Sequence, residues 1–464
     1  MNMKKKIKLN KFLSLGLIFP VPIIGIAAAC GESNDTKTET QNETQGKNSE
    51  GSDTQKTTTD TQTKTITDVS KISGLVTSRK SEITAAKSDE NKHFPMNMAV
   101  VTADGTVNDN SFNQSSWEAV QQLAALTGGE ITPVDSSTSE LEGQYSSLVN
   151  TNKNIWVLSG FQHGDELTKW LQIPENKQSF IDKKIIVIGI DWNDNKKVIP
   201  EGHYINLTYK TEEAGWLAGY ANASFLAKKF PNDANKRSAI TIGGGVFASV
   251  TDFIAGYLTG IKAWNEKNAD KKTKITDDKV ALDLGFNAQE TTTKERLEQI
   301  ATKNNPTTLL AVAGPLTEIF SDVVANKENR YLIGVDTDQS LVYTKSKNKF
   351  FTSILKNLGY SVFSVLSDLY TKKSDSKNLA GFEFNKKSAT VYLGFKDNFV
   401  DIAETSLEGE DKDLATQAIS EAKKEFTEKT QSASNDQIRT TLSIPTMDND
   451  QQNKLNKLVS EINK

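Results

Sequence analysis

The strongest constraint on the fold is a repeated alternation of short, β-branched apolar runs with amphipathic helical runs, which begins near Phe94. The first series contains predicted strands at residues 96–101, 130–134, 155–158 and 185–190, with helical runs between them. A second series starts after Pro231, with predicted strands at 238–242, 280–284, 308–313, 331–335 and 351–354. Such alternation is typical of parallel sheets covered by helices. The sequence therefore predicts an α/β protein of two lobes, each with a doubly wound parallel sheet.

This fold class also predicts where a ligand would bind. In open parallel sheets, ligands bind outside the carboxyl ends of the strands. Two lobes can place these ends on opposite sides of one cleft, which a hinge can close. Candidate binding residues are therefore those that directly follow the predicted strands.

In the first half, three side chains stand at such positions. Asp104 lies in the Gly-, Asn- and Asp-rich loop after the first strand, and Phe112 begins the helix that follows. Asp191 comes directly after the fourth strand. Phe112 either anchors its helix or offers a stacking face to a flat ligand, and Asp191 either caps a turn or contacts the ligand.

In the second half, Phe286, Gly314, Asp336 and Lys356 follow predicted strands. A glycine lets the backbone approach a ligand closely. Lys356 is either a cation of the site or an ordinary ion-paired surface lysine. Asp336 and Asp338 alone offer too few oxygen ligands for a metal ion, so no metal site is predicted.

The composition excludes several other classes of function. The histidines are His93, His163 and His203, and none has a nucleophile or a metal partner at a suitable spacing. His163, near the end of a predicted strand, could touch a ligand, but it is expected to be a surface histidine. The three glycines at 243–245 lack the Lys-Ser/Thr that a P-loop requires. A formal net charge of −4 argues against a nucleic-acid-binding surface. We therefore expect neither catalysis nor a cofactor.

The N-terminus has the pattern of a secretory signal. Residues 1–11 carry lysines without acids, residues 12–29 are apolar and uncharged, and three alanines precede Cys30. Cys30 is the only cysteine among 464 residues, so it has no disulfide partner. An uncleaved membrane anchor is the alternative. Residues 31–65 are almost wholly polar, which predicts a disordered tether or, alternatively, an adhesive or decoy tail.

Two resemblances extend this interpretation. Ala27-Ala28-Ala29-Cys30 resembles the lipobox of bacterial lipoproteins, which implies a diacylglyceryl-modified Cys30. Four segments in order resemble the Bmp family of solute-binding lipoproteins, whose characterised members bind purine nucleosides for ABC import. These segments are 111–114 (SFNQ), 213–220 (EAGWLAGY), 253–257 (FIAGY) and 333–339 (IGVDTDQ).

The family resemblance implies a type I periplasmic-binding fold with the ligand between the lobes. Phe112 and Phe286 would sandwich the base, and Asp191 would accept hydrogen bonds from its edge. Asp336 would accept from the ribose hydroxyls, near Gly314 and Lys356. The family usually has an acid where this chain has Ala103, so Asp104 is the candidate to replace it.

The expected organisation follows from these points. Its parts are a signal peptide (1–29), a lipid-anchored tether (30–91) containing a short helix of no assigned role, an N-terminal lobe (92–229), a C-terminal lobe (230–356), a return segment (357–400) and a helical extension (401–464). The expected partners are a purine nucleoside, an ABC permease with its ATPase, and the membrane. The protein is expected to be a monomer, anchored on the outer face of the cell membrane. The alternatives are a surface adhesin or sensor that kept the fold, and a binder of another flat or sugar-like solute.

Overall fold

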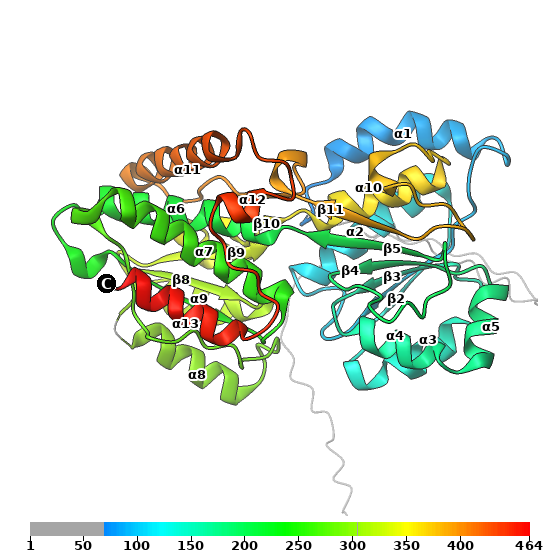
Figure 1. Ribbon diagram of the computed structural model, residues 1–464, viewed down its shortest axis with the longest axis horizontal. Coiled ribbons are helices and arrows are strands. Elements are labelled where there is room, and N and C mark those ends of the chain that lie inside the picture. The colour runs from blue at the N-terminus through cyan, green and yellow to red at the C-terminus, as the bar shows by residue number, and fades with distance from the viewer. Residues whose placement is uncertain (1–68, 304) are drawn as a thin grey trace, which may run out of the picture. The chain divides into compact units, whose positions relative to one another are not determined.

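The computed structural model describes residues 69–303 and 305–464, and these residues form two lobes, each built on a six-stranded sheet (Figure 1). They all belong to one compact unit, Lys64–Lys464. The predicted signal segment, Cys30 and the tether up to residue 68 lie outside the described residues. The two-lobed α/β architecture predicted from the strand–helix alternation is confirmed.

The sheet of lobe 1 is entirely parallel, with the strand order β11-β5-β4-β3-β1-β2. Its strands are β1 (Met98–Thr102), β2 (Ile131–Val134), β3 (Ile155–Ser159), β4 (Ile186–Ile190), β5 (Tyr204–Tyr209) and β11 (Ala389–Leu393). Its helices are α2 (Phe112–Thr127), α3 (Leu141–Leu148), α4 (His163–Leu171), α5 (Pro174–Asp182) and α10 (Leu358–Tyr370).

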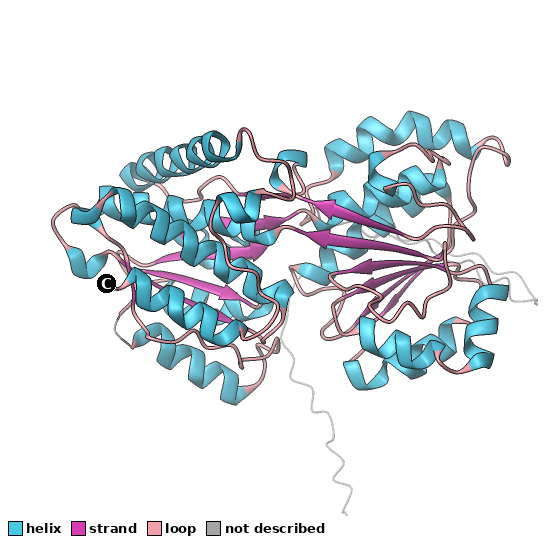
Figure 2. Cartoon of the chain, in the orientation of Figure 1, coloured by secondary structure: helices cyan, strands magenta, loops and turns pink. Residues whose placement is uncertain are grey.

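The sheet of lobe 2 repeats the same order, β12-β10-β9-β8-β6-β7, and only β12 runs antiparallel. Its strands are β6 (Ser238–Gly243), β7 (Lys274–Ile275), β8 (Thr308–Val312), β9 (Tyr331–Asp336), β10 (Phe350–Lys356) and β12 (Val400–Ile402). Its helices are α6 (Thr211–Lys229), α7 (Ala248–Lys267), α8 (Thr291–Thr302) and α9 (Thr317–Val324). Helices cover both sheets, as Figure 2 shows. Burial on two faces explains why the strands are nearly continuous apolar runs.

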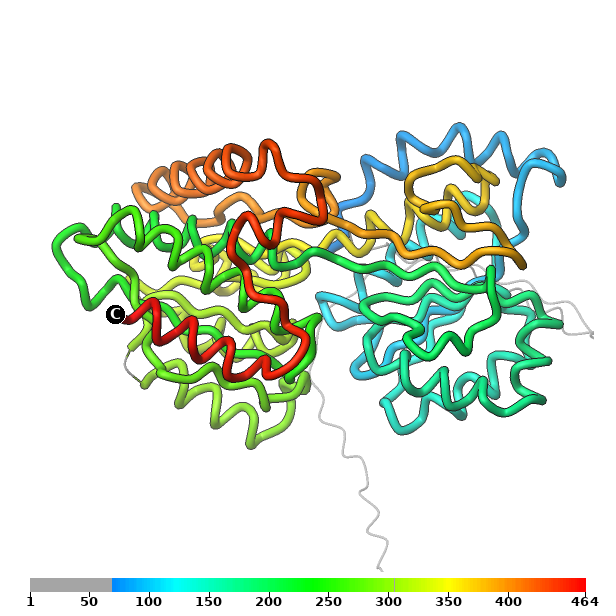
Figure 3. The backbone as a smooth tube through the Cα atoms, viewed as in Figure 1, coloured from blue at the N-terminus to red at the C-terminus, as the bar shows by residue number. Residues whose placement is uncertain are grey.

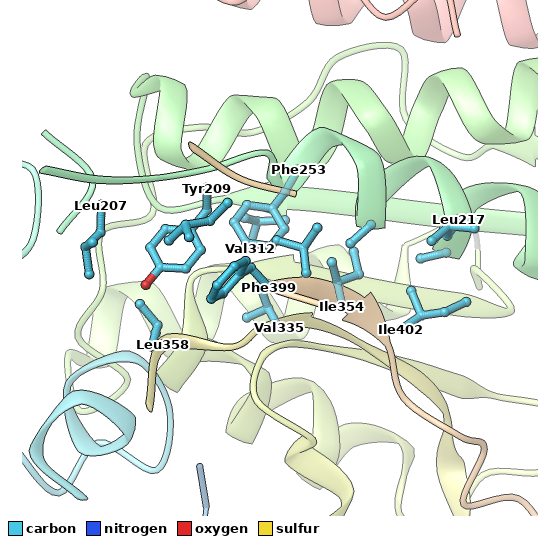
Figure 4. Packing of buried hydrophobic residues seen from close by; sticks show 14 of the residues in the cluster. Leu207, Tyr209, Leu217, Phe253, Val312, Val335, Ile354, Leu358, Phe399 and Ile402 are labelled. Atoms are coloured by element: carbon cyan, nitrogen blue, oxygen red, sulfur yellow. The ribbon is translucent and has the colours of Figure 1, made fainter. Parts of the chain in front are cut away.

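Alternate residues of one strand enter different cores. In β1, Met98 and Val100 belong to the largest buried cluster, while Ala99 and Val101 belong to a second cluster on the opposite face. The largest cluster continues from lobe 1 into lobe 2, and Figure 4 shows part of it. The lobes therefore share one continuous apolar core.

Helices α6 and α7 approach each other backbone to backbone. A Cβ added at Gly219 would lie 1.9 Å from the carbonyl oxygen of Tyr257, and one at Gly260 would lie 2.1 Å from that of Trp216. Gly215 and Gly256 make equally close approaches to the facing helix. The glycines of two of the four family segments thus serve helix packing.

The chain crosses between the lobes three times: between β5 and α6, between β10 and α10, and between β11 and β12 (Figure 3). Because α6 packs on α7, it belongs to lobe 2. The boundary predicted at residues 229 and 230 is therefore wrong, and the first crossing lies near Lys210. In the return segment, α10 packs on α2 and β11 joins the first sheet before the chain crosses back to β12.

One predicted strand is not formed. Residues 280–284 make only an isolated bridge, between Ala281 and Ile242, and the short β7 pairs with β6 instead. Strands β5, β11 and β12 were not predicted.

The two ends of the described chain pack on different lobes. Helix α1 (Ser73–Lys87) packs on α2 and α10 with Ile83 and Ala86 buried, so the predicted tether cannot extend to residue 91. In the C-terminal extension, α11 (Gly409–Thr430) packs on α6, and α13 (Gln451–Ile462) packs on α7 (Figure 1). Among the helices of the described residues, none is long and apolar enough to cross a membrane.

Candidate ligand-binding site

The seven residues predicted from strand ends line one cavity between the lobes. They are Asp104, Phe112, Asp191, Phe286, Gly314, Asp336 and Lys356. The cavity encloses about 760 Å³ counted with its opening to solvent. Strand ends from both sheets therefore meet at one place, as the fold class predicts.

An ion pair between the lobes lies in this cavity. The Lys356 ammonium, at the end of β10, contacts the Asp191 carboxylate, which follows β4. The lysine is 2% exposed, and its Nζ lies 4.9 Å from the ring centre of Phe112 and 4.8 Å from that of Tyr209. Lys356 is thus a buried cation with one carboxylate and aromatic faces around it, and not a surface lysine.

Two acids occupy equivalent places in the two sheets. Asp191 follows β4 and Asp336 ends β9, and both have left-handed backbone angles, with φ of 69° and 64°. Burial raises the pKa of Asp336 to about 6, although the charge of Lys356 opposes this shift. Burial also raises the pKa of Asp191, against the opposing effect of its contact with Lys356. Both carboxylates are therefore poorly solvated acceptors.

Gly314 lies at a close contact between the lobes. A Cβ at this position would be 2.6 Å from the Ser111 hydroxyl of the opposite lobe. Ser111 also donates to Asp336 over 3.4 Å. The Gly314 carbonyl accepts a hydrogen bond of 2.9 Å from the buried Gln339 side chain. The glycine therefore permits a lobe contact that any side chain would obstruct.

The two predicted stacking residues come from opposite lobes and are partly buried. Phe112 begins α2, whose first turn is capped by Asp109 through the backbone N–H groups of Ser111, Asn113 and Gln114. The ring of Phe286 lies against Gly244, where an added Cβ would be 2.5 Å from the ring. Both rings are thus held by local structure at the wall of the cavity.

Asp104 lies at the exposed side of the cavity. Its carboxylate accepts hydrogen bonds from Gln162 over 2.7 Å and from Thr138 over 3.3 Å. Ala103, where the family usually has an acid, is buried.

The sequence reasoning missed several cavity residues, and two of them carry unpaired polar atoms. Within the described residues, the Ser159 hydroxyl and the Asn113 side-chain oxygen are buried without a hydrogen-bond partner, and both residues line the cavity. Ser159 is the polar residue that ends β3, so the strand-end rule applied to Asp191 could have found it. Asn113 lies in the 111–114 segment, where only Phe112 was assigned a role.

A second cavity adjoins the first. Phe161, Asp191 and Ser249 line both, and Phe247 lines the second. The rings of Phe161 from lobe 1 and Phe247 from lobe 2 are 3.8 Å apart between centres. An aromatic contact between the lobes therefore stands at the boundary of the candidate site.

His163 belongs to the core of lobe 1. It contacts the Tyr145 hydroxyl at 2.6 Å and the Val101 carbonyl at 3.0 Å, and burial lowers its pKa to about 3. The prediction of a surface histidine is wrong here. Within the described part of the chain, no group of three or more His, Cys, Asp or Glu side chains is placed to hold a metal ion.

Comparison with known proteins agrees with this architecture. Residues 96–439 match the Bmp family model, described as ABC transporter substrate-binding protein PnrA-like. Basic membrane protein D of Borreliella burgdorferi is 26% identical over 321 residues, covering 68% of this chain and 81% of that protein. The ABC transporter nucleoside-binding protein BmpA of Lactococcus lactis subsp. cremoris is 24% identical over 313 residues, covering 64% and 80%.

A solved structure is similar in fold. The ABC transporter solute-binding protein from Aeropyrum pernix K1 matches with a TM-score of 0.56 at 15% identity, covering 80% of this chain and 98% of that one. At this identity the likeness concerns the fold alone. The family match extends over most of the two lobes and includes the seven cavity residues. The chain therefore belongs to the Bmp family of ABC transporter substrate-binding proteins.

Proposed function

We propose that this chain is the lipid-anchored, extracellular subunit of an ABC importer, which binds a purine nucleoside between its lobes and delivers it to a permease. The observation that carries the proposal is the pairing, in one cavity, of aromatic side chains from opposite lobes with buried acceptors at strand ends. The printed name of the Lactococcus lactis relative, a nucleoside-binding protein, agrees with it.

Each cavity residue has a role in this proposal. Phe112 and Phe286 stack on the base, and stacking on an aromatic ring contributes about 1–3 kcal/mol per base. Asp191 accepts hydrogen bonds from N–H groups at the base edge, and Asp336 accepts from vicinal ribose hydroxyls near Gly314 and Lys356. Asp104 borders the cavity on its solvent-exposed side.

The charge of the site favours a nucleoside over a nucleotide. Among the described residues that line the cavity, Asp104, Asp109, Asp191 and Asp336 are acids and Lys356 is the single cation. A phosphate would add negative charge where the effective dielectric is low, and repulsion is strong there.

The decisive experiment is calorimetric titration of residues 64–464, the compact unit that includes α1, after unfolding and refolding to remove co-purified ligand. The titrants are adenosine, guanosine, inosine, cytidine, free bases, ribose and AMP. We expect heat from purine nucleosides and none from ribose or AMP. Phe112→Ala should weaken binding by about tenfold to a hundredfold.

The matched control is Tyr392→Ala, which removes an aromatic side chain that is 62% exposed on β11 and outside the cavity. It should bind as the parent does. No heat from any nucleoside would contradict the proposal and favour an adhesin, a sensor or a binder of another solute.

The anchoring is a separate part of the proposal. Removal of residues 1–29 would leave Cys30 as the first residue, and two acyl chains on it suffice for stable attachment to a membrane. Cys30→Ala should move the protein from the membrane fraction to the medium and abolish incorporation of labelled fatty acid. If the variant stays in the membrane, the apolar segment 12–29 is an uncleaved anchor.

A further inference from the structure

The C-terminal helix α13 hydrogen-bonds to the backbone at the open edge of the lobe 2 sheet. The Asn463 side chain accepts from the Ile275 N–H and donates to the Ile275 carbonyl, both over 2.9 Å. The Asn456 side chain accepts from the Val280 N–H over 3.1 Å, and the Gln452 side chain donates to the Val280 carbonyl over 2.9 Å. Side chains of α13 and of its C-cap residue Asn463 thus pair both backbone groups of two edge residues.

This edge needs such partners because regular strand pairing stops there. Strand β7 has two residues, and the next contact with β6 is the single bridge at Ala281. The inner side of this edge segment bonds β6, so its outer N–H and C=O groups face away from the sheet. Unpaired backbone groups at a buried edge are costly, and α13 supplies their hydrogen bonds.

The same segment leads directly to the candidate site. Next to Val280, the Ala281 carbonyl accepts from the Gly243 N–H over 2.8 Å, and the Gly285 N–H donates to the Gly244 carbonyl over 2.9 Å. Phe286 follows, with its ring against Gly244. A shift of Val280 would therefore be passed along a short, hydrogen-bonded segment to a wall of the cavity.

Helix α13 is itself fixed independently of this segment. Its buried side chains Leu455, Leu458, Val459 and Ile462 belong to the core, and the helix packs on α7. Lys262 of α7 pairs with Glu461 over 2.6 Å, and Thr251 of α7 donates to Gln451 over 2.8 Å. The helix thus connects α7 to the edge of the sheet.

We propose that Asn456 and Gln452 of α13 are positioning residues for Phe286, so that this helix sets the shape of the ligand cavity without touching the ligand. The helix lies beyond residue 439, where the family match ends. The effect on affinity rests on the proposed nucleoside-binding function, whereas the effect on the 280–286 segment does not.

The test compares Asn456→Ala with Asn453→Ala, a matched control on the exposed face of the same helix. In the ligand-free protein, Asn456→Ala should speed hydrogen exchange at residues 280–286 about tenfold, and the control should not. Guanosine and inosine affinity, measured by calorimetry, should fall about fivefold, the effect of losing one hydrogen bond.

A double-variant cycle separates positioning from general destabilisation. If Asn456 acts through Phe286, then Asn456→Ala should cause no further loss of affinity in a Phe286→Ala background. An equal loss in both backgrounds, or unchanged exchange at 280–286, would overturn the proposal. If the parent binds no nucleoside, the exchange result alone decides the positioning role while the proposed function fails. Should Asn456→Ala not fold, Gln452→Ala serves the same comparison, because it removes the bond to the Val280 carbonyl together with the 3.1 Å bond to the Asn456 side-chain oxygen.

Discussion

Among single residues, Asp336 is the acid whose protonation is most informative. It lies in the cavity with Lys356, Asp191, Asp109 and the Ser111 hydroxyl around it, and burial raises its pKa to about 6. Hydroxyl donors of a ligand would stabilise its charged form, because hydrogen bonds to a carboxylate favour ionisation. Ligand binding should therefore be coupled to loss of this proton.

The first prediction concerns the pH dependence of binding. Nucleoside affinity should be about tenfold weaker at pH 5 than at pH 7, because about one tenth of the Asp336 side chains would be ionised at pH 5. Asp336→Asn should bind more weakly at pH 7 and lose most of this dependence. Calorimetry between pH 5 and 8 measures both effects, and a constant affinity in the parent would contradict the assignment.

Protonation of Asp336 has the opposite effect on the stability of the ligand-free protein. It should weaken nucleoside binding, whereas it stabilises the folded state. The folded state holds the Asp336 proton more tightly than the unfolded chain, where an aspartate has a pKa of about 3.9. Its contribution to the free energy of unfolding therefore falls as the pH rises from about 4 to about 6. Urea unfolding of the parent and of Asp336→Asn across this range would show the difference.

Most of the individual residues proposed for the candidate site could be predicted from the sequence. Asp191, Gly314 and Asp336 all lie at or just after the ends of strands, so the carboxyl-end rule and the family resemblance pointed to the same residues. Ser159 and Asn113 were not found. The strand-end rule could have identified Ser159, whereas nothing in the sequence shows that the polar atoms of these residues are buried without a partner. The surroundings of Lys356 were also hidden, since Asp191 lies 165 positions away in the chain.

Among the elements, the contact between α6 and α7 explains the glycines in two of the family segments, 213–220 and 253–257. Their glycines allow the two helix backbones to touch, and the aromatic side chains beside them, such as Trp216 and Tyr257, are buried. The glycines of these segments thus indicate a packing requirement, whereas segments 111–114 and 333–339, together with Phe253 of segment 253–257, supply cavity residues.

The second prediction tests that contact. Gly219→Ala should lower the free energy of unfolding by about 1–3 kcal/mol or more, because the added methyl group overlaps the Tyr257 carbonyl. Gly143→Ala in α3 is the matched control: it is exposed, with no atom within 4 Å of the added methyl group. It should raise stability slightly, since alanine favours helices more than glycine does. Equal effects of the two substitutions in urea unfolding would exclude the close contact.

Several elements could not be predicted, for a common reason. Strands β11 and β12 are short, and each pairs with a strand far away in sequence. Residues 280–284 look like a strand because the alternate residues Val280, Leu282 and Leu284 are apolar, yet α13 pairs the outer backbone groups of Val280. An apolar pattern indicates that a segment is buried, but it does not identify the strand or helix that pairs with it.

In the whole molecule, the lobes touch around the cavity through several independent contacts. Lys356 meets Asp191, Ser111 meets Asp336, and Phe161 meets Phe247. Lys71, just before α1, pairs with Asp338 of lobe 2 over 2.8 Å. Separation of the lobes would break these contacts together, so they oppose opening.

The third prediction concerns the rate of ligand release. Phe247→Ala should accelerate nucleoside dissociation by about threefold to tenfold, because an aromatic pair contributes about 0.5–1.5 kcal/mol. Val246→Ala, an exposed neighbour in the same loop, is the control and should leave the rate unchanged. Stopped-flow measurements give both rates, and equal rates in Phe247→Ala and the parent would show that this contact does not retain the ligand.

The three crossings also limit how the molecule can be dissected. Lobe 1 needs both the stretch that ends with β5 and the later stretch from α10 to β11, so neither lobe is encoded by one continuous piece of the gene. A protease cut at any single crossing would leave fragments still intertwined through a shared sheet. Expression of residues 92–229 alone would yield an unpaired β5 edge together with α6, a helix that packs on the other lobe. Only co-expressed or nicked fragments, and not isolated halves, should rebuild the native protein.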